Sequence, residues 1–175
     1  MQPDLNNLKA KIKANRDFID RIASSLPGFK GYVEKSENYD ADKIIRGFVT
    51  DKIITAKKNL GVISGDNVRN GNLGVTQEFD SLSLLLEGLL KKAEFADYGV
   101  SGGFSKISIT EEDQNRLLEY DWRLITAFDE IYKLSADLSS LQGDALTNGI
   151  KDIKTKIREF EKNFDDRKYV IMEVI

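Results

Sequence analysis

The chain has no cysteine and no histidine among its 175 residues. The lack of cysteine excludes disulfides, thiolate nucleophiles, zinc–thiolate sites and iron–sulfur clusters. The lack of histidine removes the commonest general base near neutral pH and the commonest ligand of transition metals. The carboxylates, lysines, tyrosines, serines and threonines that remain follow no catalytic or metal-binding spacing. We therefore expect a protein that is not an enzyme and holds no metal or cofactor.

Three further absences narrow the class of protein. The chain has two prolines, which leaves long stretches free to form helix. No stretch approaches the roughly 18 apolar residues of a membrane-spanning helix, and the polar start MQPD lacks the apolar region of a signal peptide. The net charge of −3 lacks the positive excess that drives nonspecific binding to nucleic acid. We expect a cytoplasmic protein with no transmembrane segment and no nucleic-acid partner.

A hydrophobic repeat at helical spacing dominates the rest of the chain. Such spacing places an apolar seam along a helix, which a neighbouring helix must cover. The repeat steps by three and four residues in three segments, and the first segment skips one position at Asn15. The segments are Leu5, Leu8, Ile12, Ile19, Ile22 and Leu26; Phe79, Leu82, Leu86, Leu89, Ala93 and Ala96; and Leu146, Ile150, Ile153, Ile157, Phe160 and Phe164.

These seams predict an all-α fold, an elongated antiparallel bundle of four to five long helices with coiled-coil-like seams. A chain of 175 residues suits a single domain over residues 1–175. Glycine and asparagine clusters mark the loops between the helices, and the apolar tail at 169–175 either extends the last helix or forms a short strand. The expected helices span about 4–26, 39–63, 76–98, 110–141 and 144 to at least 164, with loops at 64–75 and 100–109 and a break at Gln142-Gly143.

Charge is unevenly distributed among the expected helices. Residues 76–97 carry two basic against five acidic side chains, and residues 111–144 carry three against nine. Residues 1–35 and 145–168 carry a basic excess. Two interpretations follow: the helices neutralise one another inside the bundle, or an acidic face is kept for a basic partner.

One acidic residue lies in line with core positions. Asp121 shares a seam with Leu124 and Phe128, and a buried lone carboxylate is costly unless it is paired. We expect an edge position, or a salt bridge to Arg46 or Arg123, in preference to a catalytic acid. The neighbouring aromatic residues Tyr120, Trp122 and Phe128 either belong to the core or line a ligand pocket, and helical spacing favours the core.

The Asp/Asn-rich stretch that begins at Asp66 invites comparison with a calcium-binding loop. An EF-hand loop starting there would have Val68 at its third position and Gln77 at its twelfth. Neither side chain supplies the carboxylate that these positions require. Turn formation explains the asparagines and glycines of this stretch, so we expect no metal site.

The sequence offers one candidate interaction site, at the corner between the first two expected helices. Pro27 and Gly28 fix its shape, Gly31 allows another backbone to come close, and Phe29 and Tyr32 stand beside lysines. Rigid aromatic side chains with cationic neighbours suit the centre of an interface. The alternative is that Phe29 and Tyr32 cap the end of the bundle core.

Two stretches also resemble a known family. The first reads LPGFKGYVEK over residues 26–35 and DADKIIR over 40–46; the second contains DYG at 97–99, GFSKI at 103–107 and LEYD at 118–121. Together they resemble an uncharacterised family of small prokaryotic helical proteins with an LPGYxGYxxKE…EADKxxR core and a YGYxGFFDAxKI-like motif. The resemblance implies no catalytic role. It implies an accessory protein linked to membrane maintenance, with a membrane-associated scaffold of the SPFH (band-7) kind as partner.

The sequence therefore predicts a non-enzymatic helical scaffold or adaptor that acts through protein–protein contacts. Two alternatives belong to other classes. One is a peripheral membrane-surface protein that uses the first amphipathic helix or the apolar tail. The other is a helical bundle that binds a small apolar ligand.

Overall fold

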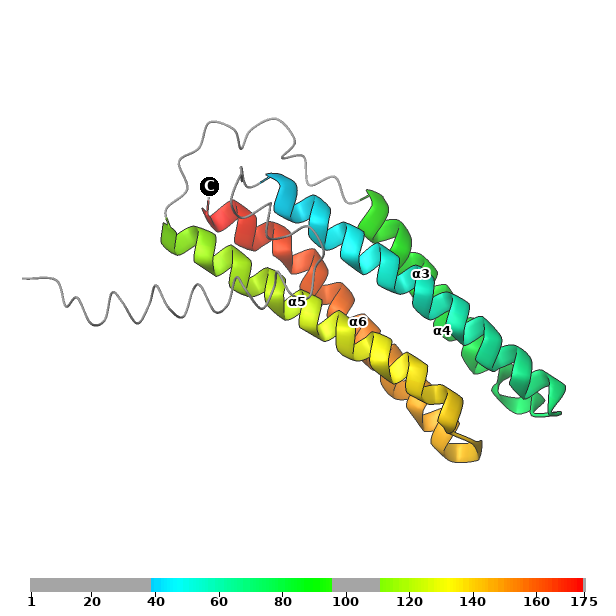
Figure 1. Ribbon diagram of the computed structural model, residues 1–175. Helices are drawn as coiled ribbons and strands as arrows, with labels where there is room; N and C mark the ends of the chain where they lie inside the picture. Colours follow the sequence, from blue (N-terminus) through cyan, green and yellow to red (C-terminus); the bar gives the residue numbers. More distant parts are fainter. Residues whose placement is uncertain (1–38, 96–110, 175) are drawn as a thin grey trace, which may run out of the picture.

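The computed structural model describes residues 39–95 and 111–174, and these stretches are helical apart from two short turns (Figure 1). They contain no strand. The long helices are α3 (Tyr39–Arg69), α4 (Thr76–Phe95), α5 (Glu111–Asp137) and α6 (Gly143–Val174), with 3-10 turns η1 (Leu73–Val75) and η3 (Leu138–Ser140). The helix expected over 4–26 and the loop expected over 100–109 lie outside the described residues.

The four described helices form two antiparallel hairpins that lie side by side, with both hairpin turns at the same end (Figure 1). One hairpin pairs α3 with α4, and the other pairs α5 with α6; between the hairpins, α3 packs on α5 and α4 packs on α6. The expected antiparallel arrangement therefore holds within each hairpin. Across the hairpins, the neighbouring helices run parallel.

Ion pairs between the helices agree with these relative helix directions. Glu78 pairs with Lys154, and further along α4 Lys92 pairs with Glu161, so residue numbers rise together along α4 and α6. Between α5 and α6 the numbers run in opposite senses, because Glu130 pairs with Lys156 whereas Asp121 pairs with Arg167.

The predicted seams form the core. All their members that the structure describes are buried: Phe79, Leu82, Leu86, Leu89 and Ala93 on α4, and Leu146, Ile150, Ile153, Ile157, Phe160 and Phe164 on α6. Phe128 of α5 meets Phe160 edge to face, with 5.0 Å between ring centroids. The core interpretation of the aromatic residues is thus confirmed for Phe128, and Tyr120 and Trp122 pack against the core while partly exposed.

Helix boundaries differ from the prediction mainly at the end of α3. This helix continues to Arg69, six residues beyond the predicted end at Ile63. Side chains support the extra turns: the Asn67 side-chain amide donates to the Ile63 carbonyl at 2.9 Å, and Asp66 pairs with Arg69 on the next turn. The loop expected over 64–75 is therefore short. The tail is helical as far as Val174, so it continues α6.

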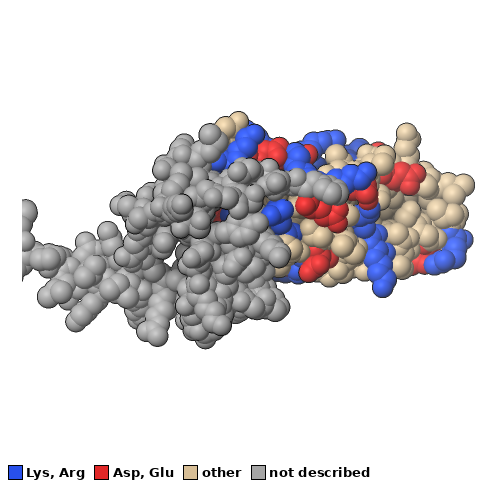
Figure 2. Space-filling model, turned by 90° about the horizontal axis from the view of Figure 1, so that it is seen from above, with Lys and Arg blue, Asp and Glu red and all other residues tan. Residues whose placement is uncertain are grey.

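Several charged residues form ion pairs between the described helices, which supports the first interpretation of the charge distribution. Lys52 of α3 bonds Asp129 of α5 at 3.1 Å, and Lys57 pairs with Glu87 of α4. Basic and acidic side chains are interspersed over the described surface seen in Figure 2. No described helix is both long enough and apolar enough to cross a membrane.

Candidate functional site: a polar pocket between the hairpin turns

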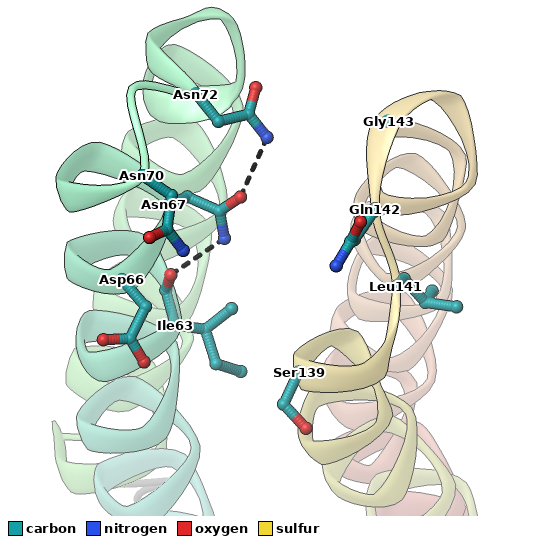
Figure 3. Close-up of a pocket in the computed structure, with 9 residues that line it drawn as sticks. All are labelled: Ile63, Asp66, Asn67, Asn70, Asn72, Ser139, Leu141, Gln142 and Gly143. Carbon is teal, nitrogen blue, oxygen red and sulfur yellow. Dashed lines mark hydrogen bonds between the residues drawn. The ribbon is translucent and has the colours of Figure 1, made fainter.

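A pocket of about 480 Å³ lies between the α3–α4 turn and the α5–α6 turn (Figure 3). Its size falls within the roughly 300–1,000 Å³ typical of ligand pockets, but such pockets are mostly apolar. Here most of the lining side chains are polar. The lining residues are Ile63, Asp66, Asn67, Asn70 and Asn72 on one side and Ser139, Leu141, Gln142 and Gly143 on the other.

The α3–α4 wall is built from asparagines that hold one another in place. The Asn72 side-chain amide donates to the Asn67 side-chain carbonyl at 2.9 Å, and Asn67 in turn donates to the Ile63 carbonyl (Figure 3). The backbone N–H of Asn72 also donates to the Asn67 carbonyl at 2.9 Å. Gly71 has a φ of 78°, a left-handed conformation that glycine adopts without strain. The chain therefore reverses tightly enough to keep Asn72 against Asn67.

The opposite wall is the short connection between α5 and α6. The Leu141 backbone N–H donates to the Leu138 carbonyl at 3.1 Å, and Ser139 Oγ donates to the Ala136 carbonyl at 2.9 Å. Gly143 begins α6 with a φ of 55°. Gln142 is exposed, and its side-chain amide points across the gap towards the asparagine wall (Figure 3).

The chemistry of the pocket is neutral hydrogen bonding. Its one charged lining residue, Asp66, pairs with Arg69. The side-chain amides of Asn70 and Gln142 make no hydrogen bond to another described residue, and each can both donate and accept. The pocket can therefore hold a neutral polar group that offers donors and acceptors together.

The stretch that begins at Asp66 does not have the conformation of a calcium-binding loop. Asp66 lies within the last turn of α3, so the stretch from Asp66 to Gln77 is not a calcium loop. No group of three or more acidic side chains that could hold a metal ion occurs in the described part of the chain.

Asp121, the acid predicted to be paired, is buried and does form a salt bridge. The partner is Arg167 of α6, and both side chains are 4% exposed. Arg167 Nε lies 2.6 Å from Asp121 Oδ1, and Nη2 lies 3.0 Å from Oδ2, which is a bidentate pair. Arg123, one of the two predicted partners, pairs with Glu119 instead. Charge pairing with a residue 46 positions away explains the buried carboxylate.

Next to this pair, Tyr120 of α5 forms a hydrogen bond to α6. Its hydroxyl donates to the Asn163 carbonyl at 2.6 Å. Burial raises the pKa of Tyr120, and the nearby carboxylates of Asp166 and Asp121 raise it further. The hydroxyl therefore stays protonated as a structural donor, as expected of a residue that belongs to the bundle's packing.

The interaction site predicted from sequence, Pro27, Gly28, Phe29, Gly31 and Tyr32, lies outside the described residues and stays a prediction. The pocket was not predicted, because its asparagines were interpreted only as turn formers. The order of the elements nevertheless indicates that the two turns meet, because two helices separate the turn at residues 70–72 from the break at Gln142-Gly143. An even number of antiparallel helices brings two turns to the same end of a bundle.

The described residues form an all-helical bundle made of two packed hairpins. Comparison of the chain with protein-family models, with curated proteins and with solved structures finds no match.

Proposed function

We propose that this protein is a non-enzymatic scaffold or adaptor that acts through protein–protein contacts. The observation that carries the proposal is the contrast between the helices and the turn end. Along the helices, charged side chains such as Lys154 and Glu78 pair with one another. At the turn end, the side-chain amides of Asn70 and Gln142 make no hydrogen bond to another described residue and remain available for a partner.

The helical body suits this role. The seams that step by three and four residues favour coiled-coil-like packing along an elongated bundle. A body with a continuous buried core holds its turn end rigidly, which lowers the entropic cost of binding a partner.

The family resemblance supplies the proposed setting. Residues 26–46 and 97–121 resemble small prokaryotic helical proteins linked to membrane maintenance, which suggests a membrane-associated scaffold as the protein partner and the cytoplasm as the location. In this proposal the contact is made with the scaffold protein and not with lipid.

Site-specific photo-crosslinking in cells that naturally produce the protein tests the proposal. A photoreactive amino acid replaces Leu73 or Ser139 at the turn end, or Lys58 or Asp152 on exposed helix faces. We expect one protein partner to be captured from a single group of neighbouring positions and not from the others. Capture of lipid alone, or of no specific protein from any position, contradicts the adaptor function.

A further inference from the structure

We infer that the pocket between the hairpin turns binds an extended, uncharged peptide segment through the backbone amides of that peptide. The inference rests on the proposed function, because it names the chemistry of the partner segment. It depends only on residues 63–73 and 139–143, all of which the structure describes.

The lining residues argue against charged and aromatic ligands. The carboxylate of Asp66 is neutralised by Arg69, so the pocket has no unpaired charge to attract an ion. No aromatic side chain lines the pocket, so a flat ring would find no stacking surface. The groups that remain for recognition are the side-chain amides of three asparagines and one glutamine.

The side-chain amides on both sides of the gap can form the same hydrogen bonds to a peptide backbone as another backbone would. A side-chain amide carries a carbonyl acceptor and an N–H donor, as a peptide bond does. In an extended chain, successive residues direct their backbone N–H and C=O groups towards opposite edges. Asn70 and Gln142 stand on opposite walls (Figure 3). One extended segment between the walls can therefore form hydrogen bonds to one wall with one edge of its backbone and to the other wall with the opposite edge. Strand addition works in a similar way, because main-chain hydrogen bonds supply its affinity.

Aliphatic side chains around the amides favour a peptide over a sugar. Ile63 points into the gap (Figure 3), and Leu141 lines the opposite wall. Aliphatic groups of this kind suit the apolar side chains of a peptide, whereas a sugar presents mainly hydroxyls. The bond from Asn72 to Asn67 fixes the asparagine wall before binding, which reduces the ordering cost.

Selection from a displayed library of peptides without charged residues tests the inference on the full chain. We expect a selected peptide to bind the Asn70→Leu/Gln142→Met double variant about tenfold or more weakly than the natural chain, because two hydrogen-bonding amides are lost. The matched control, Gln77→Met/Asn148→Leu, removes two exposed amides outside the pocket and leaves the affinity unchanged. All four side chains are exposed, so we expect the core packing to be unchanged, and thermal unfolding verifies that both variants fold.

Methylation of alternate backbone nitrogens of the selected peptide tests the mode of recognition. We expect a large loss of affinity at some alternate positions and little at the others. The inference is overturned if no library peptide distinguishes the natural chain from the pocket variant, if backbone methylation has no effect at any position, or if the pocket binds oligosaccharides on an array and no peptide. A partner crosslinked only from the helix faces would leave the adaptor function standing and would refute this pocket as its docking site.

Discussion

At the scale of single residues, the described helices contain a buried ion pair, Asp121–Arg167. Both side chains are almost fully buried and bond in bidentate fashion. If one side chain of such a pair is removed, the other charge stays buried and is not rehydrated. The pair stays bonded only if α5 and α6 keep this register, because its bidentate geometry is specific.

Removal of one member of this pair should be costly. We expect Asp121→Ala to lower the free energy of unfolding by about 3–5 kcal/mol, since buried Arg167 would lose its bidentate bond to the carboxylate. Urea denaturation followed by circular dichroism measures the loss. The double variant Asp121→Leu/Arg167→Met serves as the control and should recover much of it. A loss below about 1 kcal/mol for the single variant, the size typical of an exposed pair, would contradict this account.

Two helical glycines should respond differently to alanine. A Cβ built at Gly61 meets no described atom within 4 Å, whereas one at Gly149 would lie 2.9 Å from Leu138 Cδ2 and 3.0 Å from Leu141 Cδ1. We expect Gly61→Ala to stabilise the protein by about 0.5–1 kcal/mol through helix propensity. Gly149→Ala should gain less, because the leucine side chains must move. Thermal unfolding of both variants checks the order, and equal gains would show that this crowding costs nothing.

At the scale of elements, α4 offers a direct comparison between its core face and its exposed face. Leu86 is fully buried, and Leu84 is 72% exposed. We expect Leu86→Asp to abolish cooperative folding, because it places an unpaired charge in the core. Leu84→Asp, on the same helix, should change stability by no more than about 0.5 kcal/mol. Far-ultraviolet circular dichroism with urea titration separates the two outcomes, and a folded Leu86→Asp variant would contradict the assigned core.

The sequence predicted the described helices well because their apolar periodicity is strong. The seam from Phe79 to Ala93 is buried at every step, since burial follows directly from helical geometry. Helix ends were less predictable. Gly65 and Asn67 are typical of loops, yet α3 continues through them to Arg69, and Asn67 bonds back to Ile63 within the helix. Local propensity therefore did not decide where this helix ends.

At the scale of the whole molecule, what could not be predicted is how the two hairpins fit together. The pairing of Asp121 with Arg167 depends on the register between α5 and α6, which no local pattern records. The pocket has the same origin, because Asn70 and Gln142 become neighbours only when two turns meet at one end. An apolar seam indicates that a helix packs against a neighbour. Which helix that neighbour is depends on how well the side chains of helices far apart in the sequence fit together.

Acid should weaken the contact between the two hairpins. Lys154 and Glu78 bond at 2.5 Å between α6 and α4, and the hydrogen bond from Lys154 lowers the pKa of Glu78 below the ordinary value of 4.5. Hydrogen bonds from Lys133 and from Lys52, which lies across the hairpin boundary on α3, lower the pKa of Asp129 below 3.8. The unfolded chain then binds more protons than the folded chain in acid, so stability rises with pH in this range.

We therefore expect the free energy of unfolding to be steady above the ordinary carboxylate pKa values of 4.5 and 3.8 and to fall as the pH drops through the lowered values in the folded protein. The Glu78→Gln variant should be less stable at neutral pH and should lose less stability in acid, since its amide does not titrate. Asp80→Asn, an exposed acid on the same helix with no ion pair to a described residue, is the matched control and should keep the natural pH profile. Urea denaturation at a series of pH values gives the slopes. Identical slopes for the natural chain and Glu78→Gln would show that this ion pair contributes nothing to holding the hairpins together.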